Sequence, residues 1–97
     1  MLRCRGDEDR ATQAYRRRAF AQAINARCHV TVDLRELVFG DSSLMLDLAI
    51  LAQRLRGEGW TLRLRDPQPH VRTVIEQVGL HRLPGVSVDG SARALAY

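Results

Sequence analysis

Two short segments with the period of a β-strand flank a segment with the period of a helix, and this alternation restricts the fold most. Residues 29–34 and 60–65 each carry apolar side chains at every second position. Between them, residues 42–56 place leucines along one helix face, at 44, 48, 51 and 55. Because strand–helix–strand units with short connections form right-handed parallel crossovers, we expect an α/β fold.

The remaining chain extends the same alternation. Residues 9–26 are rich in alanine and arginine, which predicts a helix, and residues 1–5 before it are a candidate strand. Asp66 and Pro67 predict the start of another helix, Gly79 its end, and residues 86–88 a last short strand. Residues 89–97 are expected to form a loose tail. Since both clear strands alternate, helices should cover only one face of the sheet and leave Arg63 and Arg65 on the exposed face.

Length and composition are those of one small globular domain. The chain has 97 residues, of which 45% are hydrophobic and 27% charged. All 15 basic residues are arginines and, against 11 acidic ones, they give a formal charge of +4. Apolar runs are too short to cross a membrane, and residues 1–10 are too charged for a signal peptide. We therefore expect a cytoplasmic protein without membrane insertion.

Neither the cysteines nor the histidines indicate a metal or cofactor site. Cys4 and Cys28 fit reduced thiols, since a chain without a secretion signal is not expected to form disulfides. His29, His70 and His81 are not spaced as helical metal ligands. No cofactor and no metal ion are expected.

The segment Asp41-Ser42-Ser43 is the strongest candidate for a functional site. It lies where a strand leads into the leucine-striped helix, and unpaired amides and the helix dipole favour an anion there. A phosphate on Ser42 would add roughly −1.5 to −2 charges at pH 7. Aspartate and serine are also preferred N-cap residues, so capping alone is the other interpretation.

The order of these segments resembles the STAS domain, which occurs in sulfate transporters and in bacterial anti-sigma factor antagonists. The matching pieces are VTVDLREL, FGDSS, LAQRLRGEG, WTLRLRDPQP and VRTVIEQVGL. Upstream, Gly6 and Asp9 look like the family's G-x-x-D turn, so that the resemblance covers about residues 6–86.

The resemblance implies a single-domain mixed sheet of about four strands with helices mainly on one face, and a protein-docking function without catalysis. In the antagonists, an anti-sigma factor that is itself a serine kinase phosphorylates the serine after the aspartate. The unphosphorylated form binds that kinase and frees the sigma factor. By position, Ser42 is the acceptor, and Asp41 and Ser43 complete the switch loop.

Two departures from the family pattern stand out. Leu44 replaces the glycine that usually follows the two serines, which is expected to hinder close approach of a partner. The family's usual first strand is also missing from the pattern. The sheet edge exposed in this way could pair with a second copy in a homodimer.

Leu46 and Ile50 are candidates for partner docking. At about 100° per residue they project nearly opposite the leucine stripe, on the same side of the helix as Ser43. Either they form an exposed docking patch, or a neighbouring helix buries them.

Three other functions remain as alternatives. Gly40-Asp41-Ser42 looks like the opening of GDSL-type esterases, in which an aspartate orients a histidine base. Asp66 and His70 are the only candidates for these two residues, and there is one residue too many between them. The cluster Arg16-Arg17-Arg18 could bind nucleic acid or be a solvated helix face. Small STAS subunits are also similar to components of phospholipid-transport systems, so an accessory subunit of such a system is the third alternative.

Overall fold

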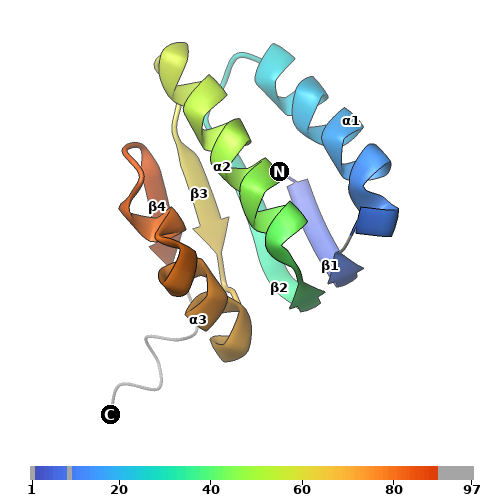
Figure 1. Cartoon of the computed structure of the whole chain (residues 1–97). Coiled ribbons are helices and arrows are strands. Elements are labelled where there is room, and N and C mark those ends of the chain that lie inside the picture. Colours follow the sequence, from blue (N-terminus) through green and yellow to red (C-terminus); the bar gives the residue numbers. More distant parts are fainter. Residues whose placement is uncertain (1, 9, 90–97) are drawn as a thin grey trace.

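The computed structural model of the chain describes residues 2–8 and 10–89 (Figure 1). Strands and helices alternate along it, as expected. The strands are β1 (Leu2–Glu8), β2 (Val30–Gly40), β3 (Leu62–Arg65) and β4 (Val86–Asp89). The helices are α1 (Gln13–Asn25), α2 (Ser42–Gly57) and α3 (Pro69–Val78), with 3₁₀ turns η1 (Arg10–Thr12) and η2 (Leu80–Arg82). Of the expected tail, Asp89 belongs to β4, and the rest lies outside the described residues.

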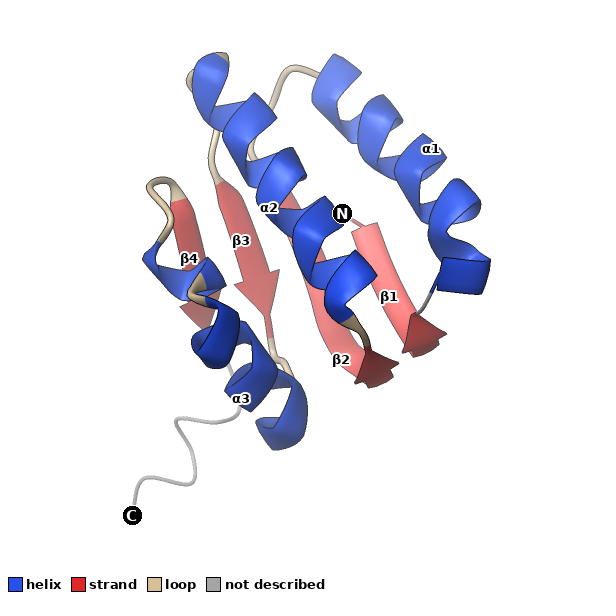
Figure 2. Cartoon of the chain, in the orientation of Figure 1, coloured by secondary structure: helices blue, strands red, loops and turns tan. Residues whose placement is uncertain are grey.

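The four strands form one sheet in the order β1-β2-β3-β4, and all three helices lie on the same side of it (Figures 1 and 2). This confirms the α/β fold with helices on one face. All three strand pairings are parallel, so the expectation of a mixed sheet is wrong for the described strands. The reason is that a helix connects each strand to the next, and such crossovers produce parallel neighbours.

Strand β2 is longer than the alternating segment at residues 29–34. It continues to Gly40 because β1 pairs with it along its length, from Leu2 opposite Val32 to Glu8 opposite Gly40. The register shifts twice along this pairing, which is why the second half of β2 lacks a regular alternation.

Helix α3 begins later than expected. Gln68 is its N-cap and Pro69 its first residue, whereas Asp66 adopts a left-handed conformation with φ of 54°. Proline does occupy the first helical position, but it is the second proline of the segment that does so. Gly79 ends the helix in a left-handed conformation with φ of 79°, as expected.

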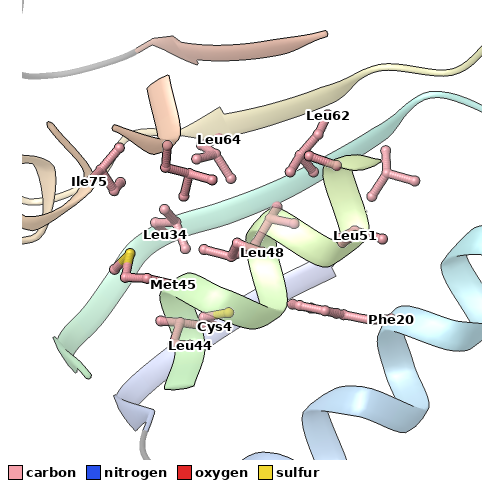
Figure 3. Packing of buried hydrophobic residues seen from close by; sticks show 14 of the residues in the cluster. Cys4, Phe20, Leu34, Leu44, Met45, Leu48, Leu51, Leu62, Leu64 and Ile75 are labelled. Atoms are coloured by element: carbon pink, nitrogen blue, oxygen red, sulfur yellow. The ribbon is translucent and has the colours of Figure 1, made fainter. Parts of the chain in front are cut away.

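The core lies between α2 and the sheet. Figure 3 shows leucines of α2 pointing at strand side chains such as Leu34, Leu62 and Leu64. The whole leucine stripe of α2 is at most 1% exposed, at Leu44, Leu48, Leu51 and Leu55.

Helix α1 contributes little to the core. Phe20 is buried, but Tyr15 is 83% exposed. Arg16, which stands among apolar residues in the sequence of this helix, is only 5% exposed. A buried arginine requires a partner for its charge, and Asp47 of α2 is that partner.

The face of the sheet opposite the helices carries charged side chains of both signs, which lie beside one another on neighbouring strands. One cross-strand row runs through all four strands and alternates in sign, with Arg3 beside Asp33, Asp33 beside Arg65, and Arg65 beside Asp89. Arg63 lies on the same face and forms an ion pair with Asp89. β1 and β4 are the edge strands, and a homodimer through the β1 edge stays a prediction.

Candidate docking site at the start of α2

Asp41 links the end of β2 to the start of α2. Its backbone is extended, with φ of −92° and ψ of −174°, and its side chain is the N-cap of the helix. Oδ1 accepts hydrogen bonds from the amides of Ser43 at 2.9 Å and Leu44 at 3.2 Å. The capping interpretation is therefore confirmed for Asp41, and two amides of the first turn are satisfied.

The two serines of this segment have different environments. Ser42, the first residue of α2, is exposed. Ser43 is 9% exposed, and its Oγ donates to Asp41 Oδ1 at 2.6 Å and accepts from Arg16 Nη2 at 3.2 Å. Of these two serines, only Ser42 is therefore exposed.

A buried ion-pair network ties α1 to this segment. Arg16 Nη2 lies 2.8 Å from Asp47 Oδ2, and Arg16 Nε donates to the same oxygen at 2.9 Å. Arg17 Nε donates to the other oxygen, Oδ1, at 3.2 Å. Through its bond to Ser43, Arg16 extends the network to the cap. The α2 start is therefore braced by a second helix.

These network residues were missed by sequence reasoning. Arg16 interrupts the apolar arc of its helix, and Asp47 lies three residues after Leu44 and four before Leu51, within the leucine stripe. The sequence did contain a signal for this buried ion pair, because an arginine and an aspartate each fall on the apolar face of a helix and buried charges occur in pairs.

The Asp41 carboxylate is held in its charged form. The hydrogen bond from the Ser43 hydroxyl lowers its pKa most; the amides of Leu44 and Ser43 and the charge of Arg16 act in the same direction. A fixed negative charge therefore lies next to Ser42 at neutral pH.

Leu44 does not hinder approach to the loop, contrary to expectation. Its side chain is fully buried and points into the core (Figure 3). The space it occupies exists because residue 40 is glycine: a Cβ there would lie 2.7 Å from Leu44 Cδ2. A glycine at the end of β2 thus accommodates the leucine that stands at position 44.

Leu46 and Ile50 are both exposed, at 56% and 41%, so burial under a neighbouring helix is excluded. They lie one helical turn apart on α2, and each borders a different groove. The α2–α3 groove has a volume of about 310 Å³ and is lined by Ser42, Met45, Leu46, Ala49, Val78, Gly79, Leu80 and Leu83. The α1–α2 groove has a volume of about 220 Å³ and includes Ile50.

The geometry does not support an esterase site. Within residues 2–8 and 10–89, no histidine side chain forms a hydrogen bond with Ser42. His70 contacts the carbonyl oxygen of Val38, and Asp66 forms ion pairs with Arg35 and Arg65. A serine nucleophile needs a base within hydrogen-bonding reach.

The Arg16-Arg17-Arg18 cluster is not one exposed cationic patch. Arg16 is buried, Arg17 binds Asp47, and only Arg18 is exposed without a partner among the described residues. Nucleic-acid binding would need several free cations on one surface.

No metal-binding group of three His, Cys, Asp or Glu side chains is found among the residues that the structure describes. Cys4 is buried in the core, whereas Cys28 is exposed. Within the same residues, none of the helices combines the length and the hydropathy that a bilayer span requires.

Comparison with known proteins identifies the fold and the family. The chain is similar to the solved structure of the anti-sigma factor antagonist SpoIIAA in its unphosphorylated form, with a TM-score of 0.74 and 23% sequence identity. The similarity covers 96% of this chain and 81% of that chain. A comparison with curated proteins gave no match. Residues 1–86 match the family model described as "Mlab, STAS domain", and the chain therefore belongs to the STAS domain family.

Proposed function

We propose that this STAS domain is a docking module that works like an anti-sigma factor antagonist. In this proposal it binds an anti-sigma factor that is a serine kinase, and phosphorylation of Ser42 ends the binding. The observation that supports it most is the position of Ser42. Its hydroxyl is exposed at the start of α2 and at the rim of an apolar groove, whereas Ser43 is buried and already hydrogen-bonded.

The α2–α3 groove is the proposed docking surface. Three large apolar side chains of its lining are exposed: Leu46 at 56%, Val78 at 55% and Leu83 at 36%. Exposed apolar side chains that cluster around a hollow are typical of protein interfaces. A partner that fills this groove would lie against Ser42.

Phosphate on Ser42 would act on the partner more than on the fold. The start of α2 favours the added charge by about 0.3–1 kcal/mol. A partner in the groove would have to desolvate that charge next to Asp41, whose carboxylate is already ionised. Like-charge contacts across an interface cost several kcal/mol. Docking should therefore be lost while the domain stays folded.

The domain itself needs no catalytic activity for this function, because the kinase partner supplies the chemistry. Ser42 is the acceptor of the phosphoryl group, and Asp41 and Ser43 keep the loop in place. The partner would act in the cytoplasm, where sigma factors bind RNA polymerase.

Affinity capture from the native cell tests this function. The baits are wild type, Ser42→Ala and Ser42→Asp, with Ser87→Asp as a matched control, because Ser87 is exposed on β4, away from both grooves. We expect wild type, Ser42→Ala and Ser87→Asp to retain a kinase-like anti-sigma factor and Ser42→Asp to lose it. Equal retention by Ser42→Asp would contradict the switch.

The match with the Mlab family model favours a second candidate, an accessory subunit of a phospholipid-transport system. In that case the same groove would bind a subunit of the transporter. The capture experiment separates the two candidates, because the retained protein would then be a transport ATPase or permease.

A further inference from the structure

The α1–α2 groove is a second concave surface, distinct from the groove beside Ser42. Its apolar lining comes from Phe20, Ala21 and Ile24 of α1 and from Ile50 and Leu51 of α2. These helices lie side by side in Figure 1. None of the residues that the structure describes lines both grooves. With about 220 Å³, it is smaller than the roughly 300–1,000 Å³ of small-molecule pockets, which suits an inserted side chain.

The charges around this groove are predominantly positive. Among the described residues, Asp47 is the only carboxylate of the lining, and Arg16 and Arg17 already neutralise it, at 2.8 and 3.2 Å. Arg54 also lines the groove, from α2. It is exposed and forms no ion pair within the described part of the chain. Two arginines, Arg17 and Arg54, therefore line the groove together with one carboxylate that is already paired.

Arg17 is held ready to bind a carboxylate. Its Nε donates to Asp47 Oδ1, which fixes the side chain, yet that side chain is 57% exposed. Its two terminal nitrogens make no hydrogen bond to any residue that the structure describes. A guanidinium fixed at Nε presents its remaining donors in the fork that matches a carboxylate.

From this combination we propose that the α1–α2 groove binds an acidic amphipathic segment of a partner protein. A bulky apolar side chain of the segment enters the groove against Phe20 and Ile50. Flanking Asp or Glu side chains pair with Arg17 on one wall and Arg54 on the other. Cations on the two walls of a groove fit a chain segment better than they fit the flat surface of a membrane. This binding does not depend on the Ser42 switch.

The test uses two synthetic amphipathic helical peptides with the same leucine stripe, one flanked by glutamates and one by lysines. Binding to the full chain is measured by fluorescence anisotropy and mapped by NMR of the ¹⁵N-labelled protein. We expect the glutamate peptide to bind and to shift the amide signals of Phe20, Ile50 and Arg54. The lysine peptide should not bind the wild type.

Charge-reversal variants test whether the arginines of the groove select the glutamate peptide over the lysine peptide. Arg54→Glu should weaken binding of the glutamate peptide by about tenfold or more, since like charges then meet across the interface, and should allow the lysine peptide to bind. The matched control is Arg18→Glu, which makes the same change on α1 outside the groove. Ile50→Ser should also weaken binding, and Ser42→Asp should leave it unchanged.

Several results would overturn this inference. One is that neither peptide binds; another is that Arg18→Glu weakens binding as much as Arg54→Glu does. A third is that the shifted signals cluster around Ser42 and Leu46. Retention by anionic phospholipid vesicles that Arg54→Glu abolishes, without peptide binding, would assign the groove to a membrane surface instead.

Discussion

Arg16 connects more of the candidate site than any other side chain described. It joins α1 to Asp47 of α2 and, through Ser43, to the cap of that helix. Such a network fixes the loop before Ser42 without using Ser42 itself. The exposed hydroxyl is therefore presented on a rigid support.

The first prediction concerns this support. Arg16→Ala should lower the free energy of unfolding by about 3–5 kcal/mol, because it leaves the Asp47 carboxylate buried with one partner fewer. Urea unfolding at pH 7 measures the change. Arg18→Ala, at an exposed neighbour, should stay within about 0.5 kcal/mol of wild type. If the two variants lost equal stability, the network would not brace α2.

The second prediction is a pH dependence at Asp41. Its pKa is lowered in the folded state, chiefly by the Ser43 hydroxyl, so this carboxylate stabilises the fold above about pH 4, the ordinary aspartate pKa. That contribution is lost as the pH falls through the lowered value. Ser43→Ala should move the Asp41 pKa back up and reduce the loss of stability on acidification. NMR titration of the carboxyl group measures this, and an ordinary pKa in the wild type would contradict the account.

At the scale of elements, the end of β2 and the start of α2 fit each other through one close contact. Gly40 has no side chain where Leu44 Cδ2 passes. Leu44 in turn closes the core under the switch loop and is fully buried. The geometry of the loop between them therefore depends on the close packing of Gly40 against Leu44.

The third prediction tests that pair. Gly40→Ala should cost about 1–3 kcal/mol by overpacking, since the new Cβ would lie 2.7 Å from Leu44 Cδ2. In a Leu44→Ala background the same substitution should cost much less, because the clash is gone. A double-mutant cycle of urea unfolding measures the coupling. Additive effects would show that the contact does not shape the loop.

The elements also show what could be predicted from the sequence. The α2 stripe and the caps at Asp41 and Gly79 follow from local period and local hydrogen bonding, and all three were predicted. The length of β2 and the start of α3 were not, because they depend on pairing with β1 and on an unusual backbone at Asp66. Arg16 was missed as a site residue for a similar reason: only its tertiary partner, Asp47, explains its burial.

At the scale of the whole molecule, the charged sheet face and the helical face have different characters. On the sheet face, Arg3 and Arg63 form ion pairs with aspartates of the neighbouring strands. The helical face carries several grooves, among them one beside Ser42 and one that is lined by Arg17 and Arg54. The helices are therefore the side on which a partner protein would dock.

The fourth prediction is that the switch leaves the molecule folded. Ser42→Asp should change the free energy of unfolding by no more than about 0.5 kcal/mol, since the side chain is exposed and the helix start favours a negative charge. Thermal unfolding by circular dichroism checks this. A large loss of stability would mean that Ser42→Asp reports on folding rather than on docking.

The most direct test of the central claim is the affinity of one purified partner for two forms of the domain. The partner is the kinase-like anti-sigma factor from the capture experiment, and the forms are the unmodified chain and the chain with phosphoserine at position 42. Calorimetric titration should show a loss of about 100-fold or more on phosphorylation, equivalent to a few kcal/mol of repulsion and desolvation. Equal affinity for the two forms would contradict the claim that Ser42 controls docking.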